Sequence, residues 1–230
     1  MRVVHYVNQF FGGIGGEEAA GSPLEERSEA VGPGRLLEHL LGDDSQVVAT
    51  LICGDNYAVE QQDDLTAAVL DKVRASKADL FVAGPCFEAG RYGMAAGALC
   101  DAVQSELGIP AVAAMHEENP GVDLYREALY IVDSGANASA MRDVISTMVS
   151  IGHKLIADED IGSPSEEGYH TRGLIRDAFV EQTSAERLVG MVMSKVNGES
   201  FESEMVSTSF EPIPVPSSVQ DISKAKVMVI

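Results

Sequence analysis

The sequence has few cysteines and no tryptophan among its 230 residues. Its three cysteines, Cys53, Cys86 and Cys100, form no C-x-x-C motif and no Cys/His pair at the spacing of metal ligands. A disulfide framework normally uses an even number of cysteines, and a structural zinc site needs paired ligands. The cysteine pattern therefore argues against both.

Long apolar runs and basic side chains are also scarce. No stretch approaches the roughly 18 apolar residues of a membrane span. Polar His5, Asn8 and Gln9 interrupt the apolar N-terminal segment, which argues against a signal peptide. Lys and Arg total 16 against 36 Asp and Glu, a formal net charge of −20. This charge disfavours nucleic acid and membranes as partners and is best explained as a solubility charge. We expect a cytoplasmic protein.

Apolar residues make up 45% of the chain, enough for one large core. Short β-branched runs alternate with stretches of helical periodicity, which favours right-handed βαβ crossovers. The predicted fold class is α/β, an open, doubly wound, mostly parallel sheet (Rossmann-like or flavodoxin-like) with an extended C-terminal arm. The expected strands are Arg2–Asn8, Gln46–Cys53, Asp79–Ala83, Ile109–Ala114 and Ala128–Asp133. The expected helices are Gly34–Leu41, Asp63–Ser76 with Asp63 or Asp64 as its N-cap, Arg91–Leu107, Ala136–Ile156 and Thr183–Asn197.

Three regions are expected along the chain. Residues 1–157 carry the α/β pattern, whereas 158–224 are acidic, turn-rich and then proline-rich around one helix. The second region is therefore expected to be an arm that packs on the domain or on a partner. The last residues, 225–230, read AKVMVI and resemble the start of another strand. An unpaired apolar edge invites aggregation, so we expect a partner there or a missing or separate second half.

The most unusual segment is a glycine-rich loop directly after the first expected strand, with Gly12, Gly13, Gly15 and Gly16. Open α/β sheets bind ligands at this edge, and glycines let backbone amides approach a small anion such as a carboxylate. The loop lacks the G-x-G-x-x-G spacing of dinucleotide sites and the GK[ST] of a P-loop. A flexible turn without a ligand is the alternative.

Three further expected strands end in polar residues at the same edge, which predicts a shared crevice. Arg91 suits a bidentate pair with a substrate carboxylate, and a salt bridge to the acidic loops is an equal alternative. The candidate ligand-binding side chains are those of Asn8, Gln9, Glu17, Asp55, Asn56, Arg91, Tyr92 and Asn119.

Candidate catalytic residues lie in the same loops. Cys86 follows a strand and precedes a helix, whose N-terminus would lower the thiol pKa, but a buried, inert cysteine is the commoner case. Glu88 and Glu118 are candidates for a buried general acid. His116 with Glu117 and Glu118 has the donor chemistry of a cation site. Three consecutive residues rarely converge on one centre, so a solvated loop is favoured and no metal is expected.

Several long blocks occur in one order along the whole chain. They are VVHYVNQFFGGIGGEE, VVATLICGDNY, DLFVAGPCFEAGRYG, ELGIPAVAAMHEENPGVDLY and IGSPSEEGY. Together they closely resemble the selenoprotein B subunit of glycine/sarcosine/betaine reductase, and the resemblance continues through Lys224–Ile230.

The resemblance implies a chemistry and a set of partners. Component B would bind glycine, sarcosine or betaine and cleave its C–N bond reductively. The carboxymethyl group would pass to a selenocysteine on protein A, and component C would release acetyl phosphate. A pyruvoyl group on a companion subunit is implied for activating glycine. This chain carries no cofactor of its own in that scheme and corresponds to the first α/β domain of a family member about twice as long.

That difference in length implies a hetero-oligomer in which another chain carries the missing C-terminal half with its selenocysteine or cysteine. The chain is then a split-gene product, a cleavage product or a truncated version, and it should not turn over alone. In the expected arrangement Gly12–Gly16 and Arg91 hold the substrate carboxylate, and Glu88 or Glu118 protonates the leaving amine. Two alternatives stay open. One is a stand-alone module that binds betaine-like ligands, and the other is a different enzyme that uses Cys86 or a metal at His116.

Overall fold

The computed structural model describes residues 1–173 and 181–204. The chain divides into two compact units, Met1–Arg176 and Asp177–Ile230. The expected strand at 225–230 and most of the expected proline-rich segment lie outside the described residues. None of the helices in the described ranges is long and apolar enough to cross a bilayer.

The first unit is built on a six-stranded sheet whose order is β2-β3-β1-β4-β5-β6. All neighbouring pairs are parallel except β2 with β3. The five parallel strands follow the flavodoxin-like order 2-1-3-4-5, in which the chain changes direction beside the first strand. The strands are β1 (Arg2–Asn8), β2 (Glu25–Arg27), β3 (Gln46–Cys53), β4 (Leu80–Ala83), β5 (Ala111–Met115) and β6 (Tyr130–Asp133).

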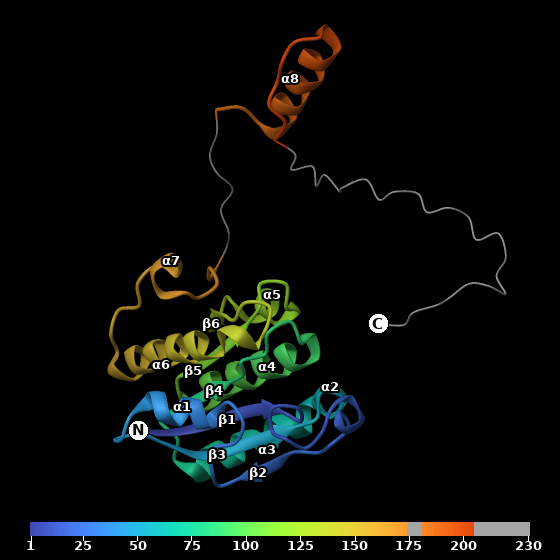
Figure 1. Cartoon of the computed structure of the whole chain (residues 1–230). Helices are drawn as coiled ribbons and strands as arrows, with labels where there is room; N and C mark the ends of the chain where they lie inside the picture. The colour runs from blue at the N-terminus through green and yellow to red at the C-terminus, as the bar shows by residue number, and fades with distance from the viewer. Residues whose placement is uncertain (174–180, 205–230) are drawn as a thin grey trace, which may run out of the picture. The chain divides into compact units, whose positions relative to one another are not determined.

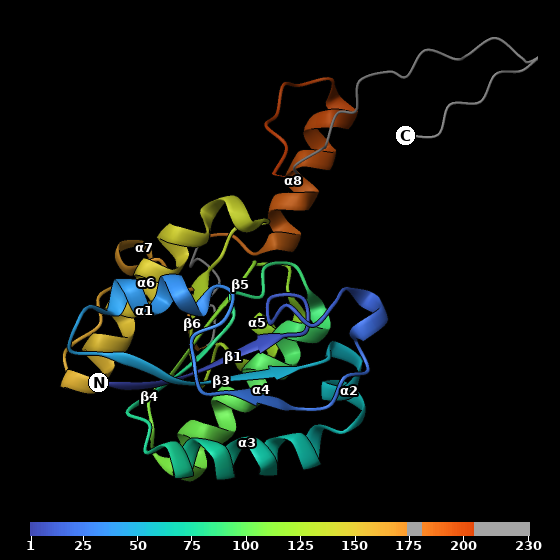
Figure 2. The ribbon, with the colours of Figure 1, turned by 60° about the horizontal axis from the view of Figure 1, so that its bottom comes forward.

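Helices cover both faces of this sheet, as the two ribbon views show (Figures 1 and 2). Helices α1 (Gly34–Leu41) and α6 (Met141–Ala157) pack against each other on one face. The other face carries α3 (Gln62–Ser76) and α4 (Gly90–Leu107). The doubly wound α/β fold is therefore confirmed. The shorter elements are η1 (Glu17–Ala19), α2 (Asp55–Glu60), α5 (Pro120–Tyr125), η2 (Ala138–Ala140) and α7 (Pro164–Glu167).

Strand alternation explains the two-sided core. Val4 and Tyr6 of β1 are buried with α3 and α4, while Val3 is buried with α1 and α6. Helix α4 packs closely because it is rich in small residues. A Cβ atom on its Gly97 would lie only 2.2 Å from the ring of Tyr125 in α5.

The structure corrects several sequence expectations. Strand β2 was not expected, because its three residues are all charged, and in the structure two of them are exposed. Gln61 is the N-cap residue of α3, and Asp63 and Asp64 lie inside its first turn, where carboxylates favour the positive end of the helix dipole. Helix α6 begins at Met141, five residues later than expected, because a 3-10 turn precedes it.

The segment that follows α6, after residue 157, packs against the sheet and helix α6 of the first unit. Tyr169 forms an antiparallel bridge with Val132 of β6, and its ring meets Tyr130 edge-on at a centroid distance of 5.1 Å. The Lys154 ammonium contacts the Glu167 carboxylate. These contacts hold the chain as far as Tyr169 on the first unit.

The described part of the second unit contains one helix, α8 (Ser184–Asn197). Thr183 and Glu186 form a capping box at its N-terminus, and Gly198 ends it in the left-handed conformation. Both signals satisfy backbone groups that a helix leaves unpaired at its ends. The expected helix Thr183–Asn197 is therefore confirmed, with Thr183 as its cap.

Candidate functional site

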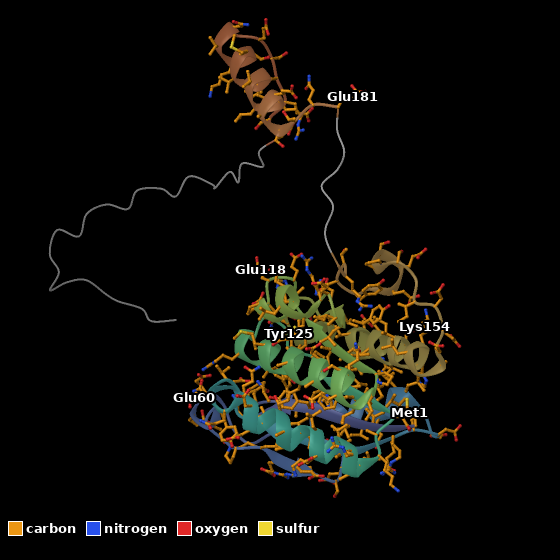
Figure 3. The ribbon with its side chains drawn as sticks, turned by 180° about the vertical axis from the view of Figure 1, so that it is seen from behind. Met1, Glu60, Glu118, Tyr125, Lys154 and Glu181 are labelled. Atoms are coloured by element: carbon orange, nitrogen blue, oxygen red, sulfur yellow. The ribbon has the colours of Figure 1, made fainter. Side chains whose placement is uncertain are left out.

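A crevice of about 390 Å³ opens where the loops after β1 and β4 diverge. This is the topological switch point, at which open α/β sheets bind ligands. In Figure 3, Glu60 and Glu118 lie toward one end of the first unit, and Met1 and Lys154 lie toward the other. The lining residues are Asn8, Gln9, Phe10, Phe11, Gly16, Glu17, Asp55, Cys86, Phe87, Glu88, Ala89 and Ala136. The loops after β1, β3 and β4 share this crevice as expected, whereas no residue of the loop after β5, which was expected to share it, is among the lining residues.

A buried carboxylate, that of Asp55, lies at the centre of a hydrogen-bond network in this crevice. Its Oδ2 accepts hydrogen bonds from Asn8 Nδ2 at 3.0 Å and from Gln9 Nε2 at 3.2 Å. The Asp55 backbone N–H donates to Gln9 Oε1 at 2.9 Å. Among the described residues, Asp55 Oδ1 is buried without a hydrogen-bond partner. Burial raises the pKa of Asp55, and the bonds from Asn8 and Gln9 oppose that rise.

The glycine-rich loop differs from the expected anion cradle. The amide N–H groups of Gly12, Gly13 and Gly15 donate to carbonyls within the loop, those of Asn8, Phe10 and Gln9 respectively. The Gly16 N–H donates to the Glu18 carboxylate at 2.8 Å, which lowers the pKa of Glu18. All four glycine amides therefore already have acceptors.

The glycine at position 12 has a packing role. A Cβ atom there would lie 2.2 Å from Ile52 Cγ2. A larger residue at this position would therefore force the loop or the Ile52 side chain to shift. Gly12, Gly13 and Gly15 are not among the residues that line the crevice, whereas Gly16 is.

Arg91, the candidate carboxylate ligand, makes the alternative contact instead. Its guanidinium donates to Glu17 Oε1 at 2.7 Å and contacts Asn56 Oδ1. The side chain is partly exposed, and neither Arg91 nor Asn56 lines the crevice. The salt bridge to an acidic loop is thus what the structure shows.

The Cys86 thiol is buried, which agrees with the alternative of an inert cysteine and not with a thiol of lowered pKa. Burial raises the pKa of Cys86 well above its usual range, and α4 begins only at Gly90. Desolvation therefore outweighs any effect of the helix dipole. Tyr92, a candidate ligand-binding residue, is fully buried and does not line the crevice, and its hydroxyl donates to the Tyr6 carbonyl at 3.4 Å.

Asn119 is engaged with backbone atoms rather than with the crevice. Its Nδ2 donates to the carbonyls of Phe87 at 2.9 Å and Ala89 at 3.1 Å. Its Oδ1 accepts the Gly121 N–H at 3.0 Å and so caps α5. Asn119 therefore positions the loop after β4, which forms one wall of the crevice.

The two candidate acids are exposed, so the expectation that they are buried is wrong. Glu88 lines the crevice, and Glu118 does not. Together with His116 they bring three ligand atoms within 4.8 Å of one another. The group with cation-binding geometry is therefore Glu88, His116 and Glu118. It differs from the three consecutive residues considered from the sequence, because Glu88 from the loop after β4 takes the place of Glu117. His116 Nδ1 lies 3.3 Å from the Glu118 backbone N–H and 3.9 Å from Glu88 Oε1.

The aromatic part of the crevice was not expected from the sequence. The Phe11 ring centroid lies 5.3 Å from that of Phe10 and 6.0 Å from that of Phe87. All three rings come from loops that follow strands at the edge where ligands bind. This position in the sequence could have identified them as candidate crevice residues. Ala89 and Ala136, which also line the crevice, offer no chemical signal in the sequence.

The sequence model of the family described as glycine/sarcosine/betaine reductase selenoprotein B matches residues 1–230. A sarcosine reductase complex component B subunit beta from Peptoclostridium acidaminophilum is 44% identical over 100% of this chain and 53% of its own length.

Two further relatives have the same coverage. A glycine reductase complex component B subunit gamma from Carboxydothermus hydrogenoformans is 42% identical over 100% of this chain and 53% of its own length. A betaine reductase complex component B subunit beta from Peptoclostridium acidaminophilum is 35% identical over the same shares, 100% and 53%. The chain thus spans about half the length of these relatives. No solved structure matches it.

Proposed function

Because the chain belongs to the glycine/sarcosine/betaine reductase selenoprotein B family, we propose that it is the substrate-binding part of a reductase complex of that type. The relatives it matches are named as component B subunits of glycine, sarcosine and betaine reductase complexes. The observation that carries the proposal is the crevice at the switch point, whose walls come from loops after β1, β3 and β4. Its volume suits a small molecule.

The proposed reaction is reductive cleavage of the C–N bond of glycine, sarcosine or betaine. The α-carbon of the substrate bonds to a selenium or sulfur atom supplied by a partner. The C–N bond breaks, and its electron pair departs with the amine. The carboxymethyl group remains on the partner atom. This chain contributes the position of the substrate, since holding two reactants together accounts for much of such a rate.

The proposed nucleophile comes from another polypeptide because the thiols of this chain are poorly suited to the step. Cys53, Cys86 and Cys100 are all buried. Burial raises the pKa of Cys53 to about 12 and also raises the pKa of the other two. A thiolate is the reactive form, so these groups are poor nucleophiles at neutral pH. The partners we propose are the chain with the other half of the family sequence, protein A and component C.

In the proposed reaction, two carboxyls exchange protons with the departing amine. Glu88 lines the crevice, and Glu118 lies beside it near His116. Both are exposed, so protons can pass between them and water. For a primary amine, a pyruvoyl group on a companion subunit would supply electrophilic activation.

Isolation of the protein with its partners from its source, under anaerobic conditions, tests the proposal. Native mass spectrometry should show companion chains, one of which carries selenocysteine or a reactive cysteine. The intact complex with a thiol reductant should release amine from glycine, sarcosine or betaine, whereas the 230-residue chain alone should not. Turnover by the chain alone, or an assembled complex inactive with all three substrates, would refute the proposal.

A binding module without catalysis is the second candidate, and the burial of all three thiols favours it. In that case the protein would be isolated as a single chain that binds betaine-like ligands. The same mass measurement separates the two candidates, because only the first requires companion chains.

A further inference from the structure

The charge of the crevice wall is one-sided. Glu17, Asp55 and Glu88 line it, and its described lining includes no lysine, arginine or histidine. The nearby Arg91 guanidinium already contacts Glu17 and Asn56. A wall of this composition attracts cations and repels anions. The part of the ligand that enters the crevice should therefore be positively charged.

The carboxylate of Asp55 is the buried member of this wall. Only 6% of the surface of the residue is exposed. Asn8 and Gln9 both donate to Oδ2, which leaves Oδ1 buried without a partner. A buried carboxylate oxygen without a donor or a cation is costly. A bound ammonium group would supply the missing positive charge.

Aromatic rings form the adjoining part of the wall. The Phe11 ring lies close to both Phe10 and Phe87, with centroid distances of 5.3 Å and 6.0 Å. Aromatic faces attract cations, and quaternary ammonium groups in particular are bound by such rings. Because the rings offer no hydrogen-bond acceptor of ordinary strength, they suit N-methyl groups better than N–H groups.

We infer that the crevice binds an alkylammonium group, preferably an N-methylated one, between the carboxylate of Asp55 and the rings of Phe11 and Phe87. This inference rests on the proposed function for the identity of the natural substrate. It reverses the orientation expected from the sequence, in which the glycine-rich loop and Arg91 hold the carboxylate. The ammonium end of the ligand lies inward, and its carboxylate end lies toward the mouth of the crevice.

Two small probes separate charge from shape. Tetramethylammonium carries the cation without a carboxylate. The anion 3,3-dimethylbutanoate has the shape and carboxylate of betaine, with carbon in place of the charged nitrogen. Saturation-transfer NMR and titration with the 230-residue chain should show binding of betaine and tetramethylammonium but not of 3,3-dimethylbutanoate. If the anion binds as tightly as tetramethylammonium does, the inference is wrong.

Variants then assign the binding to these residues. Asp55→Asn should weaken tetramethylammonium binding at least about tenfold, since it removes the charge and keeps the shape. Asp64→Asn is the matched control, because it removes a similar charge from an exposed position on α3. Phe11→Leu keeps an apolar side chain and should weaken binding about fivefold. Unchanged affinity in a folded Asp55→Asn or Phe11→Leu protein would overturn the assignment.

The outcomes also distinguish this inference from the proposed function. If the chain binds tetramethylammonium through Asp55 but the isolated complex cleaves none of the three substrates, the ammonium site stands and the proposed function fails. If the complex cleaves a substrate and tetramethylammonium neither binds nor inhibits, the ammonium site is refuted and the proposed function stands.

Discussion

Asn8 Nδ2 donates to Asp55 Oδ2 at 3.0 Å, so the last residue of β1 is joined to the first residue of α2. The two residues are far apart in the chain and meet because β1 and β3 are parallel neighbours whose carboxyl ends share one edge. Gln9 reinforces the link from the next position. Two amide side chains thus fix the position of the buried carboxylate in the crevice.

Asn8→Asp should destabilise the fold by about 2–4 kcal/mol at pH 7, because it places two buried carboxylates in contact. Like charges raise the pKa of such a pair in the folded state. The deficit relative to the wild type should therefore shrink as pH falls and one carboxyl takes up a proton. Urea unfolding at several pH values measures this. Asn137→Asp at an exposed N-cap should be nearly neutral, and a constant deficit at all pH values would contradict the argument.

Gly12→Ala should cost about 1–3 kcal/mol, because the added Cβ lies 2.2 Å from Ile52 Cγ2 and either the loop or β3 must shift. Gly21→Ala is the control, since a Cβ there meets nothing within 4 Å and the residue has no positive φ. The control should change stability by no more than about 0.5 kcal/mol. Thermal unfolding of both variants provides the test. Equal stabilities would show that Gly12 has no packing role.

The parts of the fold that the sequence predicts are those governed by local apolar patterns. The strand at Gln46–Cys53 is confirmed at its expected bounds because its residues are β-branched or otherwise apolar. Strand β2 has the sequence EER, and its pairing depends on the neighbouring edge of β3 rather than on its own residues. Such an element carries no periodic signal.

The candidate site was predictable as a place but not as a set of contacts. Parallel strands bring their carboxyl ends to one edge, so the crevice follows from the strand order. The partner of Arg91 depends on where Glu17 and Asn56 come to lie, which no spacing specifies. The burial of Cys86 likewise depends on α4 and the neighbouring strands packing over it. Tertiary packing decided both.

Asn119→Ala should destabilise the protein by about 2–4 kcal/mol, more than the loss of an ordinary helix cap. The cap of α5 accounts for about 1 kcal/mol. The carbonyls of Phe87 and Ala89 also lose their donor. Asn137→Ala removes a cap from η2 without a further donor role and should cost only about 1 kcal/mol. Chemical denaturation of the two variants measures the difference, and equal losses would refute a positioning role for Asn119.

The three thiols should react slowly with a thiol reagent such as dithionitrobenzoate in the folded protein at pH 8. Cys53, Cys86 and Cys100 are buried, and burial raises the pKa of each. In urea all three should react within minutes. Rapid modification of Cys86 in the folded chain, lost in Cys86→Ala but not in Cys100→Ala, would instead revive Cys86 as a nucleophile.

His5 should make the stability of the first unit depend on pH in acid. Its Nε2 lies 2.7 Å from the Gly84 carbonyl, and burial lowers the pKa of His5 to about 4. In the unfolded chain the His5 imidazole takes up a proton near pH 6.5, whereas in the folded state it does so only near pH 4. The free energy of unfolding is therefore unaffected by protonation of His5 above pH 6.5. It decreases by about 3 kcal/mol as the pH falls from 6.5 to 4, because only the unfolded chain takes up a proton there.

His5→Gln isolates this contribution, since a glutamine amide can still donate to the Gly84 carbonyl but does not titrate. Its free energy of unfolding should fall less steeply than that of the wild type between pH 6.5 and 4, because the proton uptake of the unfolded chain at this position is gone. His153→Gln removes an exposed histidine from α6 and serves as the control, with a slope close to that of the wild type. Parallel curves for His5→Gln and the wild type would mean that the His5 side chain is protonated equally in the folded and unfolded states. The buried, neutral imidazole would then be the wrong description of the β1–β4 junction.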